Sequence, residues 1–272
     1  MYSLPDDQTI LSIIEPLALA AGRRIMEIVR DGFQAEEKAD CSPVTRADRD
    51  AEAIILAGLR QNFSSIPVVA EEEAAEGMAP QQVGSVFFLV DPLDGTREFV
   101  RGGDDFTVNI ALVRDEAPVV GVVYAPVRHE LYVGRPGLAE MVRTNAAHKA
   151  IARNPIAVRE RQSPPVIVAT RSHNTPETDE FVMRHEPAIR VTVGSSLKFC
   201  LVAAGEADIY PRFGRTMQWD TAAGDAVLRA AGGQTFLTDG TPFRYGRDIV
   251  AGDAPFASPH FIAQGAGAPV CN

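Results

Sequence analysis

The sequence predicts an α+β or α/β chain folded as a five-layer αβαβα sandwich. Three observations predict this fold: two amphipathic helices come first, short apolar strands with short linkers follow, and strands then alternate with helices. Hydrophobic residues make up 46% of the 272 residues, so the chain can bury a sizeable core. Two sheets sandwiched between helix pairs would give the five layers.

Two helices are expected at the start of the chain. Residues 7–30 carry apolar side chains at spacings of three and four, and Gly32 is expected to end this helix. A second helix is expected at about 46–61. Thr45 and Asp48 have the spacing of a capping box at its start.

Strands dominate the next part of the chain. They are predicted at 66–70, 87–91, 107–113, 117–126 and 130–135. Short linkers between the later ones indicate antiparallel neighbours. The sequence then becomes polar around 145–163, with Pro155 inside this stretch and Pro164 and Pro165 directly after it. We therefore expect an N-terminal α+β half at 1–155 and a C-terminal α/β half at 156–272.

The second half alternates between strands and helices. Strands are predicted at 166–170, 190–194 and 207–213, and helices at 176–186, 195–205 and 220–231. A final strand pair is expected at about 234–237 and 247–251. This alternation is typical of an α/β layer.

Composition excludes several classes of function. The chain has 26 Lys and Arg against 36 Asp and Glu, a formal net charge of −10. This balance argues against binding a nucleic acid polymer or an anionic membrane surface. No segment resembles a signal peptide or a transmembrane segment, and the three cysteines form no CxxC pair. We expect a cytoplasmic protein.

The segment FFLVDPLDGTREFV, residues 87–100, is the most informative. One tight turn would present Asp91, Asp94 and the Leu93 carbonyl, which are oxygen ligands suited to a hard divalent cation. The backbone N–H groups of Gly95 and Thr96 could receive a phosphate at a helix start. The alternative is a type I turn that uses Asp and Gly for conformation alone.

Three further carboxylates favour the metal interpretation. Glu71 directly follows an apolar strand, Asp220 lies in the first turn of a small-residue helix, and Asp48 lies at the start of the second helix. Each has an ordinary alternative: a solvated charge run for Glu71, and a helix N-cap for Asp220 and Asp48. Their joint occurrence in one chain is more informative than any of them alone.

The set VVAEE, DPLDGT and WDTAAG resembles the signature of the magnesium-dependent, lithium-sensitive phosphatases. This superfamily includes inositol monophosphatase, fructose-1,6-bisphosphatase and the 3′(2′),5′-bisphosphate nucleotidases. The resemblance runs from the first helix to about residue 250. It implies the five-layer sandwich of the inositol monophosphatase and fructose-1,6-bisphosphatase type.

Within that superfamily the chain resembles the bacterial CysQ-type nucleotidases more closely. The similarity rests on SPVTRADRDAE, DDFTVNIALV, GSSLKFCLVAAGEADIYPRF and MQWDTAAGDAVLRAAGG. It implies hydrolysis of 3′-phosphoadenosine 5′-phosphate to AMP and phosphate. Two positions depart from the branch pattern: Arg97, where Lys is common, and Asp225, where His often stands. An inositol or sugar phosphate monoesterase and a catalytically silent metal- or nucleotide-binding protein are the alternatives.

The resemblance implies two or three Mg²⁺ ions. Glu71, Asp91 and the Leu93 carbonyl would hold one ion, which would activate a water. A second ion would stabilise the leaving oxygen and would be held by Asp91, Asp94 and Asp220.

Catalytic and substrate-binding roles also follow from the resemblance. Thr96 would take the proton of the attacking water, assisted by Asp48, and Glu71 would share in catalysis through its metal. Gly95 and Thr96 would bind the transferred phosphate. Four residues of the second half would contact the nucleotide: His173, Ser195, Lys198 and Arg212. The expected partner is thus a small nucleotide bisphosphate, with homodimerisation and a peripheral position at the inner membrane left open.

Overall fold

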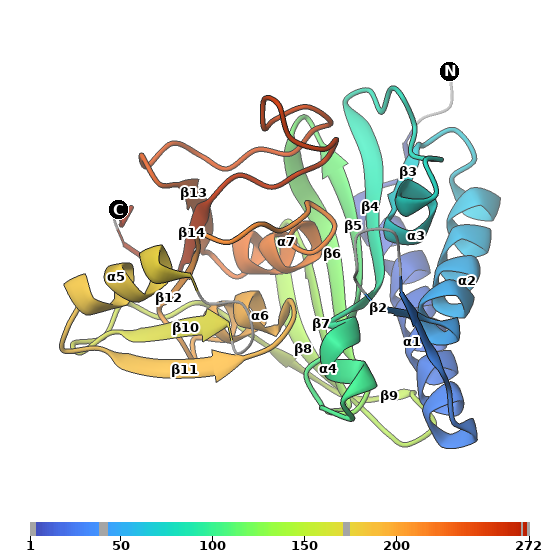
Figure 1. Ribbon diagram of the computed structural model, residues 1–272, viewed down its shortest axis with the longest axis horizontal. Helices are drawn as coiled ribbons and strands as arrows, with labels where there is room; N and C mark the ends of the chain where they lie inside the picture. The colour runs from blue at the N-terminus through green and yellow to red at the C-terminus, as the bar shows by residue number, and fades with distance from the viewer. Residues whose placement is uncertain (1–3, 38–42, 171–174, 268, 271–272) are drawn as a thin grey trace.

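The computed structural model describes residues 4–37, 43–170, 175–267 and 269–270. Five layers lie side by side across the molecule, in the order helices, sheet, helices, sheet, helix (Figure 1). The predicted αβαβα sandwich is therefore confirmed. In the described chain the last layer holds one helix, α5 (Pro176–Arg184), where a pair was expected.

The first layer consists of helices α1 (Asp7–Asp31) and α2 (Arg46–Asn62), which pack on each other and on one face of the larger sheet. Their apolar stripes, at helical spacing, form one core cluster with that sheet face. Gly32 ends α1 with φ 80° and donates its N–H to the Val29 carbonyl, as the sequence predicts.

The larger sheet has seven strands in the order β3-β4-β5-β6-β7-β8-β9. Its strands are β3 (Val68–Ala70), β4 (Val86–Asp94), β5 (Thr107–Arg114), β6 (Ala117–Ala125), β7 (Glu130–Arg135), β8 (Leu138–Thr144) and β9 (Ala150–Pro155). Only the β3–β4 pair is parallel. Strands β8 and β9 extend the sheet beyond the sequence prediction.

The smaller sheet has five strands in the order β11-β10-β12-β14-β13. Its strands are β10 (Val166–Thr170), β11 (Ile189–Val193), β12 (Ile209–Arg212), β13 (Gln234–Leu237) and β14 (Phe261–Gln264). The predicted strand at 247–251 is wrong. That segment forms turns on the surface, where Ile249 is 38% exposed, whereas β14 supplies the buried partner of β12 and β13.

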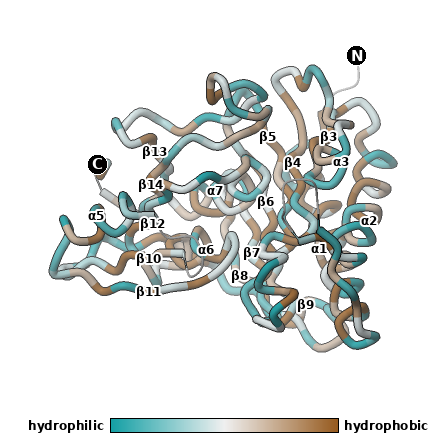
Figure 2. The backbone as a smooth tube through the Cα atoms, in the orientation of Figure 1, coloured by the Kyte–Doolittle hydropathy of each residue, from teal (hydrophilic) through white to brown (hydrophobic). Residues whose placement is uncertain are grey.

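The middle layer holds α6 (Leu197–Ala203) and α7 (Ala222–Ala230), which lie between the two sheets (Figure 1). Helix α7 packs on β5, β6 and β7 of the larger sheet, although it lies between β12 and β13 of the smaller sheet in the chain. Figure 2 shows hydrophobic stretches along these strands and hydrophilic residues along many surface loops. Helix α7 belongs to the predicted C-terminal half but packs on strands of the predicted N-terminal half. The division of the chain at residue 155 therefore stays a prediction.

Four short elements complete the described fold. They are β1 (Ala35–Glu37), β2 (Pro43–Thr45), α3 (Glu71–Ala75) and α4 (Thr96–Val100). The last two begin directly at the ends of β3 and β4, so neighbouring strands deliver two helix starts to the same edge. Within the described ranges, none of the helices is long and apolar enough to cross a bilayer.

Candidate active site

Strand β4 runs into the turn that the DPLDG motif encodes. Asp91 is only 1% exposed, and its Oδ1 accepts the Leu93 N–H at 2.9 Å. The ladder with β5 is irregular between Asp91 and Asp94, where Pro92 donates no hydrogen bond. Gly95 then adopts φ 93°, and a Cβ at this position would lie 2.8 Å from a backbone oxygen of the following loop. Glycine is therefore required before α4 begins.

Asp48 joins this turn to the first helical layer. Its Oδ2 accepts the Thr45 N–H at 2.7 Å and the Thr45 hydroxyl at 2.8 Å, so the predicted capping box is present. Its Oδ1 lies 3.1 Å from the Thr96 hydroxyl, which also lies 3.1 Å from the Leu93 carbonyl. Asp48 is therefore both a cap and a partner of Thr96. Burial raises its pKa, which makes the carboxylate a better proton acceptor.

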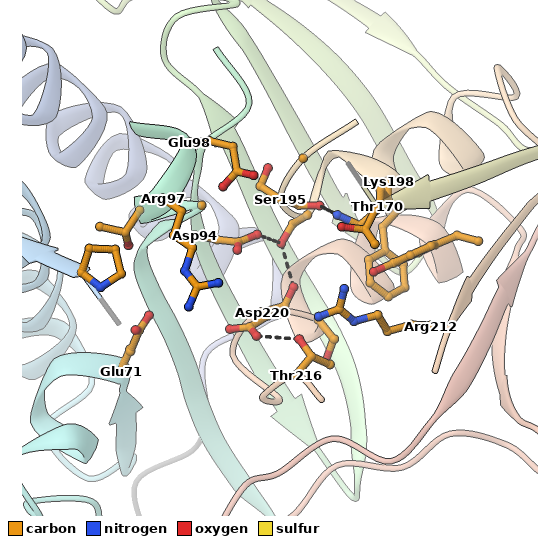
Figure 3. A pocket seen from close by; sticks show the side chains of 18 residues that line it. Glu71, Asp94, Arg97, Glu98, Thr170, Ser195, Lys198, Arg212, Thr216 and Asp220 are labelled. Atoms are coloured by element: carbon orange, nitrogen blue, oxygen red, sulfur yellow. Dashed lines mark hydrogen bonds between the residues drawn. The ribbon is translucent and has the colours of Figure 1, made fainter. Parts of the chain in front are cut away.

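One pocket brings the other carboxylates together. Figure 3 shows Glu71, Asp94 and Asp220 pointing into the same space, from the start of α3, the end of β4 and the segment before α7. The Asp220 Oδ2 accepts the Thr216 hydroxyl at 2.6 Å and the Met217 N–H at 2.9 Å. The N-cap of α7 is Thr221, so Asp220 lies just before the helix. Its predicted place in the first turn and the N-cap alternative are therefore both wrong.

Mutual repulsion and burial disfavour ionisation of this group. Burial first, and then the charges of Glu71, Asp94 and Asp220, raise the pKa of Asp91 well above its usual value. Burial and the Asp220 charge raise the pKa of Asp94 to about 6. Burial and the Glu71 charge raise the pKa of Asp220. A bound cation would relieve this repulsion, so the donor chemistry suits a hard divalent ion.

The carboxylates do not form a closed ligand shell as they stand. Across the described ranges, no three Asp, Glu, His or Cys side chains converge tightly enough to enclose an ion. Protein groups hold two of the carboxylates: Ser196 Oγ lies 3.0 Å from Asp94 Oδ2, and Thr216 binds Asp220. The carboxylate oxygens of the described residues therefore line one pocket, but they do not converge on a single point.

The opposite wall of the pocket is cationic. Lys198 and Arg212 line it, from α6 and β12 (Figure 3). Lys198 is 5% exposed, and burial lowers its pKa to about 8. In the described chain, Arg212 Nε and Ser195 Oγ are buried without a hydrogen-bond partner. Buried polar atoms of this kind are ordinarily paired, so they are available to a ligand.

The predicted site residues that the structure describes thus line one cavity or contact residues that line it. Its lining includes Glu71, Asp94, Gly95, Thr96, Ser195, Lys198, Arg212 and Asp220. Asp91 and Leu93 are buried beside it, and Asp48 reaches it through Thr96. His173 lies outside the described residues.

Sequence reasoning missed two hydroxyl residues that hold the carboxylates. Besides contacting Asp94, Ser196 Oγ lies 2.7 Å from the Asp220 carbonyl, and Thr216 holds the Asp220 side chain. Thr216 lies four residues before Asp220, a spacing that local reasoning could have used. Ser196 lies 102 residues from Asp94, so only the fold reveals that contact.

Comparisons with known proteins identify the family of this chain. The model of the inositol monophosphatase family matches residues 6–268. The 3′(2′),5′-bisphosphate nucleotidase CysQ of Escherichia coli K12 is 43% identical over 232 residues, which cover 84% of this chain and 91% of that protein. The crystal structure of CysQ from Bacteroides thetaiotaomicron has a TM-score of 0.77 and 35% identity, and the match covers 97% and 99% of the two chains. An inositol monophosphatase from Anabaena has a TM-score of 0.69 and 26% identity, with coverage of 94% and 90%.

Proposed function

Because this chain belongs to the inositol monophosphatase family, we propose that it is a magnesium-dependent 3′(2′),5′-bisphosphate nucleotidase. Its reaction would be hydrolysis of 3′-phosphoadenosine 5′-phosphate to AMP and phosphate. One observation carries the proposal: a single pocket has a carboxylate wall beside Thr96 and a cationic wall formed by Lys198 and Arg212. A substrate with two separate phosphates can use both walls.

The carboxylate wall would hold the phosphate that is removed. Glu71, Asp91, Asp94, Asp220 and the Leu93 carbonyl are the proposed Mg²⁺ ligands. Bound Mg²⁺ supplies Lewis acidity, which lowers the pKa of a water and stabilises the leaving oxygen. The N–H groups of Gly95 and Thr96 would orient the phosphate oxygens.

Thr96 and Asp48 would manage the proton of the attacking water. The Thr96 hydroxyl donates toward Asp48 Oδ1 at 3.1 Å, which leaves the Thr96 oxygen free to accept from water. The water oxygen would bond to phosphorus as the bond from phosphorus to the ribose 3′ oxygen breaks. That ribose oxygen takes up a proton, so one water is consumed for each phosphate released.

The cationic wall would bind the 5′-phosphate. Arg212 can bind two phosphate oxygens through its fork of donors, whereas Lys198 contributes a point charge. Ser195 adds a hydroxyl. The unpaired Arg212 Nε and Ser195 Oγ support this role, because an anion would satisfy both.

The test is a comparison of kcat/KM for 3′-phosphoadenosine 5′-phosphate and myo-inositol 1-phosphate, each with Mg²⁺ and with excess chelator. We expect at least tenfold preference for the nucleotide, no activity in chelator, and inhibition by millimolar Li⁺. An equal or greater kcat/KM for the inositol ester would instead assign the chain to the inositol phosphate monoesterases.

A further inference from the structure

Glu52 is a buried carboxylate that the proposed reaction does not use. It lies on α2, is 5% exposed, and reaches across to the start of α3. Its Oε2 accepts the Glu72 N–H at 2.8 Å, and its Oε1 accepts the Glu73 N–H at 3.0 Å. Both carboxylate oxygens therefore bind backbone donors of one helical turn.

Helix α3 depends on this external partner because its own cap is missing. The N-cap residue is Ala70, which has no side chain able to accept a hydrogen bond. The first turn nevertheless leaves N–H groups that need acceptors. Glu52 supplies them from another helix, so it fixes the backbone immediately after Glu71.

A carboxylate at this position carries an electrostatic cost. Burial, followed by the charges of Glu73 and Glu71, raises the pKa of Glu52 to about 7, although the two backbone N–H groups lower it. A neutral Gln would avoid that charge. However, Gln has one acceptor oxygen, and its NH₂ group would face the second N–H donor. Only a carboxylate can accept both bonds.

We propose that Glu52 is a positioning residue that orients Glu71 toward a divalent cation. This inference rests on the proposed function, because Glu71 must be a metal ligand. Glu52 would act through the backbone of α3 without touching the ion or the substrate. Residues that hold metal ligands in place often matter almost as much as the ligands themselves.

The experiment measures Mg²⁺ affinity of Glu52→Gln by isothermal titration calorimetry of the full chain. Fluorescence of Trp219, the single Trp of the sequence, provides a second readout because it precedes Asp220 and lines a neighbouring cavity with Glu71 and Asp220. We expect affinity to fall about 10- to 100-fold. We also expect kcat to recover to within about threefold of wild type at saturating Mg²⁺.

The matched control is Glu73→Gln. The Glu73 side chain also links α3 to α2, through an ion pair with Arg60 at 2.7 Å. This bond joins two side chains and leaves the first-turn N–H groups of Glu72 and Glu73 to Glu52. We expect Mg²⁺ affinity of this variant to stay within twofold of wild type. Equal losses in both variants would mean that any link between these helices suffices, which would overturn the proposal. Unchanged affinity in Glu52→Gln would overturn it as well.

Failure of the proposed function gives a different pattern. A wild-type protein that binds Mg²⁺ but does not hydrolyse 3′-phosphoadenosine 5′-phosphate would refute the substrate assignment only. Glu52→Gln would then still show weakened binding in both titrations. A wild-type protein that binds no Mg²⁺ in either titration would refute the metal site and the role of Glu52 together.

Discussion

At the scale of single residues, Asp48 shows how one side chain serves fold and site together. One of its oxygens caps α2 through Thr45, while the other lies 3.1 Å from the Thr96 hydroxyl. The sequence predicted both interactions, because the first is local and the second follows from the family resemblance. Asp225, which departs from the branch pattern, serves the fold alone. It is buried, does not line the pocket, and accepts from Thr235 Oγ1 at 2.7 Å and Arg229 Nε at 3.0 Å.

The first prediction concerns Thr96. Thr96→Val removes the hydroxyl that lies between Asp48 Oδ1 and the Leu93 carbonyl, and it preserves the side-chain shape. We expect kcat to fall about 100-fold or more, since a positioned proton acceptor typically contributes that much. Steady-state kinetics and thermal unfolding would measure it. Thr96→Ser should retain at least a tenth of wild-type kcat, and full activity in Thr96→Val would contradict the proton role.

The second prediction concerns Arg212. Arg212→Gln removes the charge of the cationic wall, and we expect KM for 3′-phosphoadenosine 5′-phosphate to rise about tenfold or more. Catalytic efficiency on myo-inositol 1-phosphate, which has no second phosphate, should change less than threefold. Arg244→Gln is the control, because it alters net charge equally at an exposed ion pair with Glu116. Equal losses on both substrates would argue against a 5′-phosphate contact.

At the scale of elements, strongly periodic segments were predictable and weakly patterned ones were not. Helices α1 and α2 lie within two residues of their predicted bounds because a sheet buries one continuous apolar stripe of each. Strand β9 has no apolar pattern, and all six of its residues are exposed. It forms only because β8 offers an edge, which a local pattern does not reveal.

The third prediction concerns the packing of α7. A Cβ at Gly134 on β7 would lie 2.6 Å from the Val227 Cα, so Gly134→Ala must push α7 away from the sheet. We expect a loss of about 1–3 kcal/mol in unfolding free energy, together with reduced kcat, because α7 follows Asp220 directly.

Urea unfolding followed by circular dichroism would measure this loss. Gly246→Ala is the matched control, since its nearest neighbour would be the flexible end of Ile249 at 3.4 Å. Equal stability of the two variants would contradict the close approach of α7 to the sheet.

At the scale of the whole molecule, the pocket depends on contacts between the connections of the two sheets. Asp105, in the β4–β5 connection, is 1% exposed and accepts the Gly194 N–H at 2.9 Å. It also forms an ion pair with Arg128. Gly194 directly precedes the turn that carries Ser195 and leads into α6. Asp105 therefore holds the cationic wall against the carboxylate wall.

The fourth prediction tests this connection. Asp105→Ala leaves Arg128 unpaired and the Gly194 N–H without its acceptor, so we expect a loss of about 2–4 kcal/mol in unfolding free energy. KM for 3′-phosphoadenosine 5′-phosphate should also rise, because the Ser195 turn loses its anchor. The control is Asp104→Ala, at the exposed neighbouring residue. It should change the unfolding free energy by less than about 0.5 kcal/mol, as surface substitutions usually do. Equal losses in the two variants would refute the anchoring role.

The sequence by itself determined the layered fold and the segments that carry the carboxylates. It could do so because apolar periodicity and tight-turn chemistry are local properties of a few consecutive residues. Only the tertiary structure decided which groups without a sequence signal meet: Ser196 with Asp94, and Glu52 with the first turn of α3. These contacts join residues 20 to 102 positions apart, and their existence depends on how the layers pack.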